Sequence, residues 1–415
     1  MTSPDAGSAD RSAPTDRSAP TDWSAPTDRS APTGWSARAD EAARSVTRMF
    51  GQRLFFLPGT HIAAIERPSS RLKNLMRPWH YWWQAHYVDC LVDAGRRELA
   101  RAARFDGGSR PSAGRLASQL VTGIRLRNFL TVVNNYYDDM AWLALSTLRL
   151  EKLAEQTRKP GARRNARIRQ SLTLQFDSAS TDDLGGGTFW SKKRDFKNTP
   201  ATAPVALYYA RTGNTARAQA LVDWLHAKLF DPVQGMYQDG LRIGADGEVV
   251  LEAAIYTYNQ GPVLGALLEL GGHANLDRAA ALVDAVARNL TRPATLASGR
   301  TAAVLRCDGT GDGGLFTGIL ARYLALAAAD QRLTDRTRAT AAALVTETAQ
   351  ALWDGRRAVA QEEPLARHGA HLVFPVFAET PASRSYPAGA AVELSTQLQA
   401  WMVLEAAATV RPASN

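Results

Sequence analysis

About a dozen segments with helical periodicity follow one another from residue 38 onward, and this succession limits the fold more than any other feature. Very short turns that contain Gly join many neighbours, for example at Gly213-Asn214 and Gly271-Gly272. Neighbours joined in this way must lie antiparallel, so the pattern predicts an all-α fold whose helices close into a ring. An α-solenoid would also need a repeated sequence period, and the chain has none. The segments with 3.6-residue apolar spacing are 39–57, 78–104, 113–132, 137–158, 164–176, 198–212, 215–230, 252–271, 275–291, 312–329, 333–353 and 390–409.

The chain before residue 38 has a different character. The hexapeptide Asp10-Arg11-Ser12-Ala13-Pro14-Thr15 recurs up to residue 33, with one Arg replaced by Trp23. Proline at every sixth position prevents a helix, and almost no apolar residue is available for burial. The sequence therefore predicts a disordered tail over 1–37 and one helical domain over 38–410.

The formal charge of +9 raises the question of a nucleic-acid partner. Arginines are scattered over nearly every predicted helix, and the one dense run, Arg163, Arg164, Arg167 and Arg169, sits where a loop opens a helix. A solvated face explains this distribution better than a nucleic-acid interface, so no such partner is predicted.

Cysteine and histidine usage indicates neither a disulfide framework nor a metal centre. Cys90 and Cys307 lie in apolar surroundings without a CxxC partner, which is typical of buried thiols. The histidines show no HExxH pattern, and neither a cofactor nor a metal is predicted.

Neither a secretory signal nor a transmembrane segment is predicted. The N-terminus has no basic region followed by an apolar core, and no apolar run approaches the ~18 residues that span a bilayer. We expect a cytoplasmic protein, with export by another route left open.

Four longer irregular stretches, rich in Gly, Asp and aromatic residues, are expected to build the functional site. They cover residues 177–197, 231–251, 292–311 and 354–389.

The strongest local signal is a pair of adjacent acids, Asp138 and Asp139, which open an apolar helix after Tyr136 and Tyr137. Acids in a first helical turn also complement the helix dipole and cap amides, so a purely structural role is the alternative. Two carboxylates between aromatic side chains are typical of a sugar-cleaving site, because a glycosidase needs one acid and one nucleophile or base.

Aromatic residues give a second signal. Trp82 and Trp83 lie on the first long helix, and Trp190 follows a glycine run. Indole faces pack against the C–H faces of sugar rings, although core packing explains Trp82 and Trp83 about equally well.

Polar residues among tyrosines give a third signal. Tyr258, Asn259 and Gln260 begin a helix after a loop, where amides suit hydroxyl recognition or serve as caps. Asp239-Gly240 could hold a hydroxyl group, but this dipeptide is more often a turn. Asp308 starts a segment that resembles a calcium loop as far as Gly313, yet Ile319 stands where a bidentate acid is required, so calcium is not predicted.

Together these pieces resemble glycoside hydrolase family 76, the endo-α-1,6-mannanases, over residues 45–405. The matching landmarks, in family order, are Trp82-Trp83, YYDDxAW, GGGxFW, Lys197-Asn198, Asp239-Gly240, YTYNQG and Asp312-Gly313 leading to Arg322-Tyr323-Leu324. YYDDxAW and YTYNQG are the specific ones.

The resemblance implies an (α/α)6 barrel and a retaining hydrolase that cleaves α-1,6-linked mannose chains of a mannan, lipomannan-type glycan or mannooligosaccharide. Asp138 takes the family's nucleophile position and Asp139 the acid/base position. The nucleophile is expected to have a lowered pKa and the acid/base a raised one. The predicted substrate-binding residues are Trp82, Trp83, Tyr137, Trp190, Asn198, Asp239, Tyr258, Asn259, Gln260 and Asp312.

The chain departs from the family pattern at Thr317, where the family commonly has a lysine, so a basic side chain is missing. Two other classes stay open. One is a different barrel enzyme, either epimerase-like or similar to unsaturated-glucuronide hydrolases, and the other is a non-catalytic glycan-binding barrel.

Overall fold

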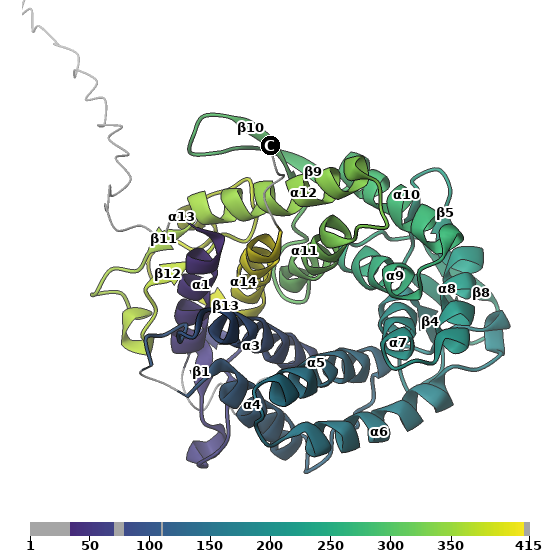
Figure 1. Ribbon diagram of the computed structural model, residues 1–415, viewed down its shortest axis with the longest axis horizontal. Helices are drawn as coiled ribbons and strands as arrows, with labels where there is room; N and C mark the ends of the chain where they lie inside the picture. The colour runs from purple at the N-terminus through teal and green to yellow at the C-terminus, as the bar shows by residue number, and fades with distance from the viewer. Residues whose placement is uncertain (1–33, 70–78, 109–110, 411–415) are drawn as a thin grey trace, which may run out of the picture.

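A computed structural model describes residues 34–69, 79–108 and 111–410, and these residues form two concentric rings of helices (Figure 1). Each inner helix packs against the next around a closed ring, and α14 returns to α3. The inner helices are α3 (Tyr81–Arg101), α5 (Tyr137–Gln156), α7 (Thr199–Arg211), α9 (Thr257–Leu270), α11 (Gly313–Ala329) and α14 (Leu394–Thr409).

Each inner helix carries one helix of the outer ring on its outward side. The outer helices are α1 (Trp35–Phe50), α4 (Ala113–Arg127), α6 (Ala162–Ala179), α8 (Thr215–Leu229), α10 (His273–Asn289) and α12 (Asp335–Asp354). Outer and inner helices alternate along the chain, and α1 closes the outer ring by packing on α14. The predicted (α/α)6 barrel is confirmed.

Apolar patterning determines which ring a helix joins. The inner helix α14 is apolar nearly all round, and almost every residue in it is buried. The outer helix α10 has one apolar stripe, with buried Ala279, Leu282, Val283 and Val286 at helical spacing. A helix that is apolar on all sides is stable only inside, whereas a single stripe needs one packed face and one wet face.

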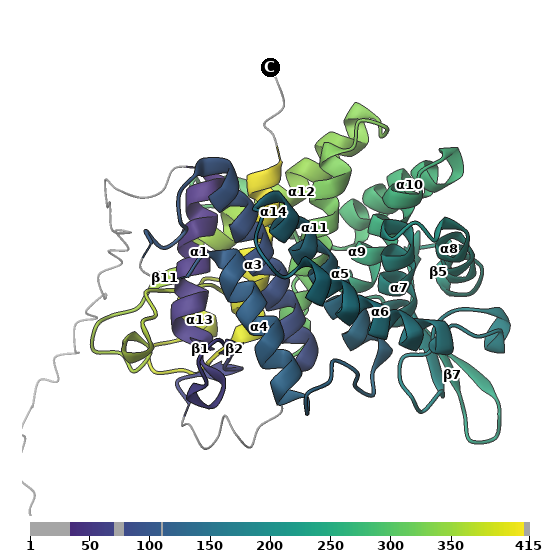
Figure 2. The same cartoon turned by 60° about the horizontal axis from the view of Figure 1, so that its bottom comes forward.

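The two ends of the barrel differ. Connections from inner to outer helices are short, for example 212–214 and 271–272, whereas connections from outer to inner helices are mostly long. Inner helices therefore all begin at the end that carries the long connections, which points downward in Figure 2 where β1 and β7 are labelled. Any site built from inner-helix N-termini and long loops must lie at this end.

The strands of the described chain all lie in these long connections, mostly as antiparallel pairs. β4 (Phe196–Asn198), β7 (Gly240–Ile243) and β8 (Val249–Glu252) form a three-stranded sheet. The pairs are β1 (Gly51–Gln52) with β2 (Ile62–Ala63), β3 (Glu66–Arg67) with β13 (Val392–Glu393), β5 (Phe230–Asp231) with β6 (Met236–Tyr237), β9 (Thr291–Thr295) with β10 (Thr301–Leu305), and β11 (Arg357–Ala358) with β12 (Leu372–Val373).

Several predicted helix ends are wrong because pairing of extended backbone competes with the helix. α1 ends at Phe50, where Gly51 turns into strand β1, so the predicted helix up to residue 57 is too long. α9 and α14 begin several residues after the predicted starts because Glu252 and Val392 belong to strands. α1 also begins at Trp35, inside the predicted tail; residues 1–33 of that tail lie outside the described residues.

The predicted turn at Asp239-Gly240 is also corrected. Gly240 starts the central strand β7 and pairs with Asn198 on one side and Glu252 on the other. A Cβ atom at Gly240 would lie 2.6 Å from the Asn198 Cβ and 2.7 Å from the Lys197 carbonyl oxygen. Glycine is needed there for close strand packing.

Candidate active site

The acid pair lies at the N-terminus of the inner helix α5, at the barrel end with the long connections. Tyr136 precedes the helix in extended conformation, and Asp138 and Asp139 occupy its first turn. The backbone N–H of Tyr137 donates to the Trp190 carbonyl oxygen at 2.8 Å, which attaches the helix start to the glycine-rich connection. Both carboxylate side chains are half-buried.

One carboxylate oxygen of Asp138 binds a tryptophan, and the other has no hydrogen-bond partner among the described residues. The indole N–H of Trp190 donates to Asp138 Oδ2 at 2.9 Å, and Oδ1 is buried without a partner. Burial raises the pKa of Asp138, although the backbone N–H groups at the helix start and the Trp190 indole oppose this rise. The expected lowered pKa is therefore wrong, because no cation among the described residues lies within ion-pair distance to compensate for burial.

Asp139 has a different environment. The side-chain amide of Asn134 donates to Asp139 Oδ2 at 2.6 Å. Burial and the adjacent Asp138 carboxylate raise the pKa of Asp139 well above its ordinary value, as expected for the second acid. At neutral pH the pair is therefore arranged to keep a proton on Asp139.

Aromatic side chains lie near Asp138, since Trp190 binds it and its charge acts on the Tyr258 hydroxyl. The rings of Tyr258 and Phe316 stack with centroids 3.8 Å apart, and Trp82 lies 6.4 Å from Tyr258 and 6.3 Å from Phe316. All three side chains are partly exposed, as is Trp190. Such a surface offers the apolar contacts that pyranose rings require.

Asp312 joins this aromatic group through its carboxylate. Its Oδ1 accepts hydrogen bonds from the indole N–H groups of Trp82 at 3.1 Å and Trp83 at 2.8 Å. The side chain remains more than half exposed, and its charge contributes to the raised pKa values of Asp138 and Asp139. Asp312 thus fixes two tryptophans and keeps the site negative.

Asp239 and Asn259 form a second polar unit. The Asn259 side-chain amide donates to Asp239 Oδ1 at 3.2 Å, and Asn259 Oδ1 is buried without a partner. Burial raises the pKa of Asp239 to about 6. A buried acceptor without a donor is costly, so this unit is suited to receive hydroxyl groups.

The other predicted binding residues are supporting residues in the structure. Gln260 is fully buried; its amide accepts from the Tyr237 N–H and donates to the Tyr237 and Tyr256 carbonyl oxygens. Asn198 is buried and caps α7 by accepting from the Ala201 N–H. Trp83 and Tyr137 are buried as well, so the structure separates them from the exposed surface of the site.

A glutamine clamp is the main feature that the sequence analysis missed. Gln84, Gln260 and Gln397 each occupy the fourth position of an inner helix. Each accepts from the backbone N–H and donates to the carbonyl oxygen of one residue in the preceding connection: Ala63, Tyr237 and Phe374, respectively. The shared position was a signal that could have revealed the clamp before the structure.

Lys197 holds the glycine-rich connection that carries Trp190. Its ammonium group is fully buried with the side chain and donates to the carbonyl oxygens of Thr181, Asp183 and Gly186 at 2.7–2.8 Å. Burial lowers the pKa of Lys197 to about 8. The sequence analysis recorded Lys197 only as a landmark and assigned it no role.

Thr317, the departure from the family pattern, is buried. Its hydroxyl donates to the Arg306 carbonyl oxygen at 2.6 Å. Arg306 binds Asp308, which in turn accepts from Thr257 at the start of α9. The segment that resembles a calcium loop therefore holds a helix start instead.

Neither a metal cluster nor a membrane span is found in residues 34–69, 79–108 and 111–410. No group of three or more His, Cys, Asp or Glu side chains there is placed to hold an ion. No helix in the same ranges is long and apolar enough to cross a bilayer. Cys90 and Cys307 are buried free thiols.

A double ring of helices with half-buried carboxylates among aromatic side chains defines a barrel-type glycoside hydrolase. The sequence model of glycosyl hydrolase family 76 matches residues 60–364, and the protein belongs to this family. Membership decides against the epimerase-like and glucuronide-hydrolase-like alternatives. A comparison with curated proteins found no significant match.

Solved structures agree with this assignment. The family 76 α-1,6-mannanase from Salegentibacter sp. HEL1_6 is 26% identical, with a TM-score of 0.71 over 91% of this chain and 100% of that chain. An inactive variant of that mannanase, with two consecutive aspartates changed to asparagine, was solved with α-1,6-mannotriose and gives the same values. A family 76 mannosidase from Bacteroides thetaiotaomicron VPI-5482 has a TM-score of 0.66 at 18% identity, over 90% of this chain and 98% of that chain, which supports the fold alone.

Proposed function

We propose that this protein hydrolyses α-1,6-linked mannose chains with retention of configuration, with Asp138 as nucleophile and Asp139 as acid/base. One observation carries the proposal: two consecutive carboxylates at an inner-helix N-terminus have unequal partners, and no cation of the described residues lies within ion-pair distance of them. The likeness to a mannanase inactivated at two consecutive aspartates, and solved with mannotriose, supports the same assignment.

In the first step an Asp138 oxygen attacks the anomeric carbon and the glycosidic bond breaks. Asp139 gives its proton to the departing O6 of the neighbouring mannose, and a glycosyl ester of Asp138 remains. In the second step Asp139 takes a proton from water, and the water oxygen attacks the same carbon. The ester bond breaks, Asp138 leaves as a carboxylate, and Asp139 is protonated again.

The environments of the two acids suit these roles. Asp138 is held by the Trp190 indole N–H and by helix N-terminal amides, which favour its ionised form relative to that of its neighbour. Asp139 has the charge of Asp138 beside it, which favours its protonated form. Two carboxyl groups with separated pKa values are the usual requirement for an acid and a nucleophile in one site.

The aromatic and polar groups supply the binding surface in this proposal. Trp82, Tyr258 and Trp190 offer ring faces and edges to the mannose units, and Asp239 with Asn259 receives hydroxyl groups. Asp312 acts by orienting Trp82, since it accepts the indole N–H of that residue.

The test is hydrolysis of linear α-1,6-mannotetraose by the wild-type protein and by Asp138→Asn and Asp139→Asn. We expect cleavage by the wild type, loss in both variants, and an α-anomer as the first product seen by NMR. No cleavage by folded wild-type protein would contradict the proposal, and measured mannotetraose binding would then indicate the glycan-binding alternative. A β-anomer as first product would contradict retention.

A further inference from the structure

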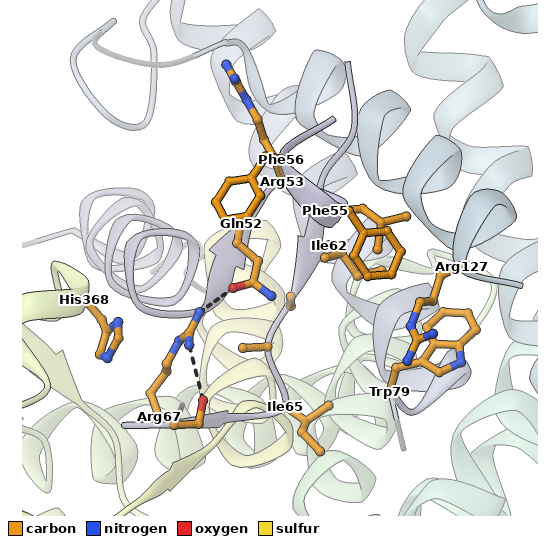
Figure 3. Close-up of a pocket in the computed structure, with 14 residues that line it drawn as sticks. Gln52, Arg53, Phe55, Phe56, Ile62, Ile65, Arg67, Trp79, Arg127 and His368 are labelled. Carbon is orange, nitrogen blue, oxygen red and sulfur yellow. Dashed lines mark hydrogen bonds between the residues drawn. The ribbon is translucent and has the colours of Figure 1, made fainter. Parts of the chain in front are cut away.

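A cavity lies at the same end of the barrel, apart from the acid pair and beside the first helix of the inner ring (Figure 3). Its volume is about 480 Å³, and its walls come from the connection between α1 and α3 and from the end of α4. The apolar part of its wall contains Leu54, Phe55, Ile62, Ile65 and Trp79. The proposed catalytic residues take no part in it.

The charged residues of this cavity are all basic. Arg53, Arg67 and Arg127 line it together with His368, and its described lining contains no Asp or Glu. Figure 3 shows the arginines around the apolar side chains. A cavity with one sign of charge on apolar walls attracts a ligand of the opposite charge.

Arg67 is the key group because it is buried and has no acidic partner among the residues that the structure describes. It is 7% exposed, and its guanidinium donates to three neutral oxygens: Met49 O at 3.1 Å, Ser69 Oγ at 3.2 Å and Gln52 Oε1 at 2.8 Å. No carboxylate of the described residues lies within ion-pair distance of it, and burial lowers its pKa. An uncompensated buried cation is costly, and a bound anion would offset that cost.

The rim of the cavity is apolar and conformationally unusual. Phe55 is 55% exposed and Phe56 is 69% exposed, and both have positive φ, at 46° and 62°. Bulky residues seldom adopt this conformation, and strain of this kind concentrates at binding sites. The rim therefore presents apolar rings to solvent next to the exposed Arg53.

We propose that this cavity binds an anionic amphiphile, a phosphate ester that carries a hydrocarbon chain. Arg67 binds the phosphate, Arg53 adds positive charge at the rim, and the chain lies along Phe55, Ile62, Ile65 and Trp79. Guanidinium groups match phosphate oxygens in geometry as well as in charge.

The position of the cavity gives this ligand a role, which rests on the proposed function. Trp79 comes just before α3, and Gln84 of α3 accepts from the Ala63 N–H and donates to the carbonyl oxygens of Ala63 and Trp79. The cavity wall and the helix that carries Trp82 are thus one connected unit. A mannan attached to a phospholipid would be held by its anchor beside the catalytic end.

Titration calorimetry tests the proposal with three probes below micelle concentration. n-Dodecyl phosphate carries both features, inorganic phosphate carries only the anion, and n-dodecyl maltoside carries only the chain. We expect dodecyl phosphate to bind at least about tenfold more tightly than either other probe. Equal binding of inorganic phosphate would indicate a free-anion site, equal binding of the maltoside would indicate apolar contact only, and no binding of dodecyl phosphate would remove the site; each outcome overturns the proposal.

Variants place the binding in the cavity. Arg53→Gln, at an exposed side chain, should weaken dodecyl phosphate binding about fivefold, as one surface charge near an anionic headgroup does. Arg67→Gln should weaken it at least about tenfold, with thermal unfolding measured alongside because Arg67 is buried. Arg300→Gln and Val233→Ser, exposed positions outside the cavity lining, are the matched controls and should bind as the wild type does. Unchanged binding in folded Arg53→Gln and Arg67→Gln would overturn the assignment.

Activity and binding can fail separately. Arg53→Gln should cleave soluble α-1,6-mannotetraose at the wild-type rate, since it leaves the acid pair intact. Binding of dodecyl phosphate by a wild-type protein that does not cleave mannotetraose would leave the cavity in place and remove the proposed function. Cleavage of mannotetraose by a wild-type protein that does not bind dodecyl phosphate would support the proposed function and remove the proposed ligand site.

Discussion

Two pairs of carboxylates lie on neighbouring inner helices, and their surroundings are opposite. Asp89 and Asp93 of α3 bind the guanidinium groups of Arg149 and Arg322, with Arg322 at 2.6 Å from Asp93 and 3.3 Å from Asp89. In the described chain Asp138 and Asp139 of α5 have no cation within ion-pair distance; their partners are an indole and an amide. Arginine side chains therefore neutralise the charge of Asp89 and Asp93, whereas no described cation neutralises that of Asp138 and Asp139.

The pKa values follow this difference. Burial would raise the pKa of Asp89, but Arg149 and Arg322 outweigh it and the pKa is lowered. For Asp138 and Asp139 burial is not outweighed, and both pKa values are raised. Buried charges are usually paired, so the unpaired carboxylates cost stability that only a function explains.

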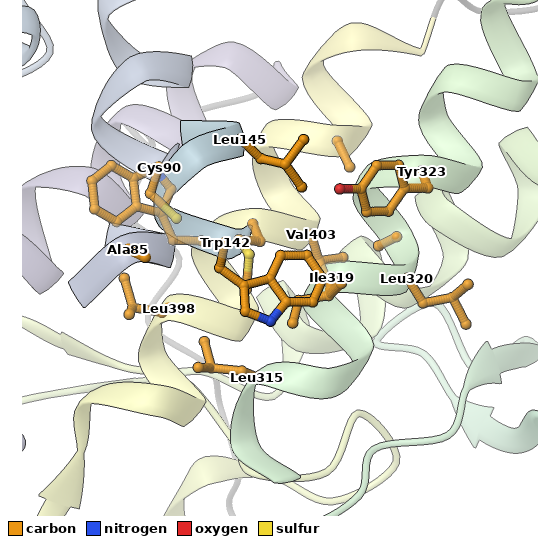
Figure 4. Packing of buried hydrophobic residues seen from close by; sticks show 14 of the residues in the cluster. Ala85, Cys90, Trp142, Leu145, Leu315, Ile319, Leu320, Tyr323, Leu398 and Val403 are labelled. Carbon is orange, nitrogen blue, oxygen red and sulfur yellow. The ribbon is translucent and has the colours of Figure 1, made fainter. Parts of the chain in front are cut away.

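A layer of apolar and aromatic side chains separates the two pairs. Trp142 of α5 and His86 of α3 lie between them along the helices, with ring centroids 4.8 Å apart. Figure 4 shows Trp142 beside Leu315 and Ile319 of α11 within this layer. The arginines below therefore do not reach the acids above, and substitutions can test the two pairs independently.

The largest expected effect is on catalysis and separates the roles of Asp138 and Asp139. Asp138→Ala and Asp139→Ala should each lower kcat on mannotetraose by at least about 10³-fold, because each removes a group that reacts directly. On an α-1,6-mannobioside with a dinitrophenol leaving group, added azide should rescue both. Asp139→Ala should yield the α-azide through the Asp138 ester, and Asp138→Ala the β-azide by direct displacement, as NMR would show.

The paired carboxylates serve as the control for this experiment. Asp89→Asn should change kcat little for the fraction of protein that remains folded. An α-azide from Asp138→Ala would reverse the assigned roles, and a 10³-fold loss of kcat in folded Asp89→Asn would remove the distinction between the pairs.

The next effect concerns stability. Arg322→Met should lower the free energy of unfolding by about 3–5 kcal/mol, because it leaves Asp89 and Asp93 with only one guanidinium group in a buried place. Urea denaturation at pH 7 measures the change. Arg336→Met, at an arginine that is 83% exposed, is the control and should be nearly neutral; a loss below about 1 kcal/mol for Arg322→Met would mean that the cluster does not stabilise the barrel.

Replacing Trp190, which binds the proposed nucleophile, should have a smaller effect on kcat. Trp190→Phe removes the indole N–H that binds Asp138, so kcat should fall about tenfold, the value of one hydrogen bond to a charged group. The pKa of Asp138 should rise further, which moves the acidic limb of the pH–rate profile to higher pH. Trp224→Phe is the matched variant: its indole donates to the Leu184 carbonyl oxygen, so it should affect stability and leave the acidic limb in place.

The comparison of the two carboxylate pairs also shows which features could be predicted from the sequence. Apolar periodicity predicted about a dozen helices that close into a ring, and the family resemblance implied the (α/α)6 barrel. The acid pair was predictable since it interrupts an apolar helix at its start. The raised pKa of Asp138 was not predictable, because it depends on which cations the fold places near this carboxylate.

The surroundings of other predicted binding residues were not predictable for a related reason. Trp82 and Trp83 are adjacent in sequence, yet the helix turns one toward the exposed site and buries the other. Gln260 looked like a group for hydroxyl recognition, but its amide is used by the backbone of Tyr237 and Tyr256. Short connections were well predicted, whereas partners across long connections require the folded chain.

The smallest expected effect is a gain in stability, whereas replacing a buried residue usually lowers stability. The double variant Asp138→Asn/Asp139→Asn should be more stable than the wild type by about 1 kcal/mol at pH 8, because it removes two uncompensated charges that remain partly screened by solvent. The raised pKa values mean that the folded wild type binds more protons than the unfolded chain, whose Asp pKa is about 3.9. Wild-type stability therefore falls as pH rises from that value through the folded pKa values, and the advantage of the variant should vanish below about pH 4.

Asp89→Asn should show the opposite pH dependence. The lowered pKa of Asp89 contributes stability that is present above its unfolded value and lost as pH falls through the folded one, so the variant is less stable at pH 8 and approaches the wild type in acid. Thermal unfolding of all three proteins from about pH 2 to pH 8 measures both trends, because the contribution of Asp89 is lost only below about pH 4. Parallel curves for the two variants would mean that the pairs do not differ in charge compensation, and the electrostatic argument for the function of Asp138 and Asp139 would then fail.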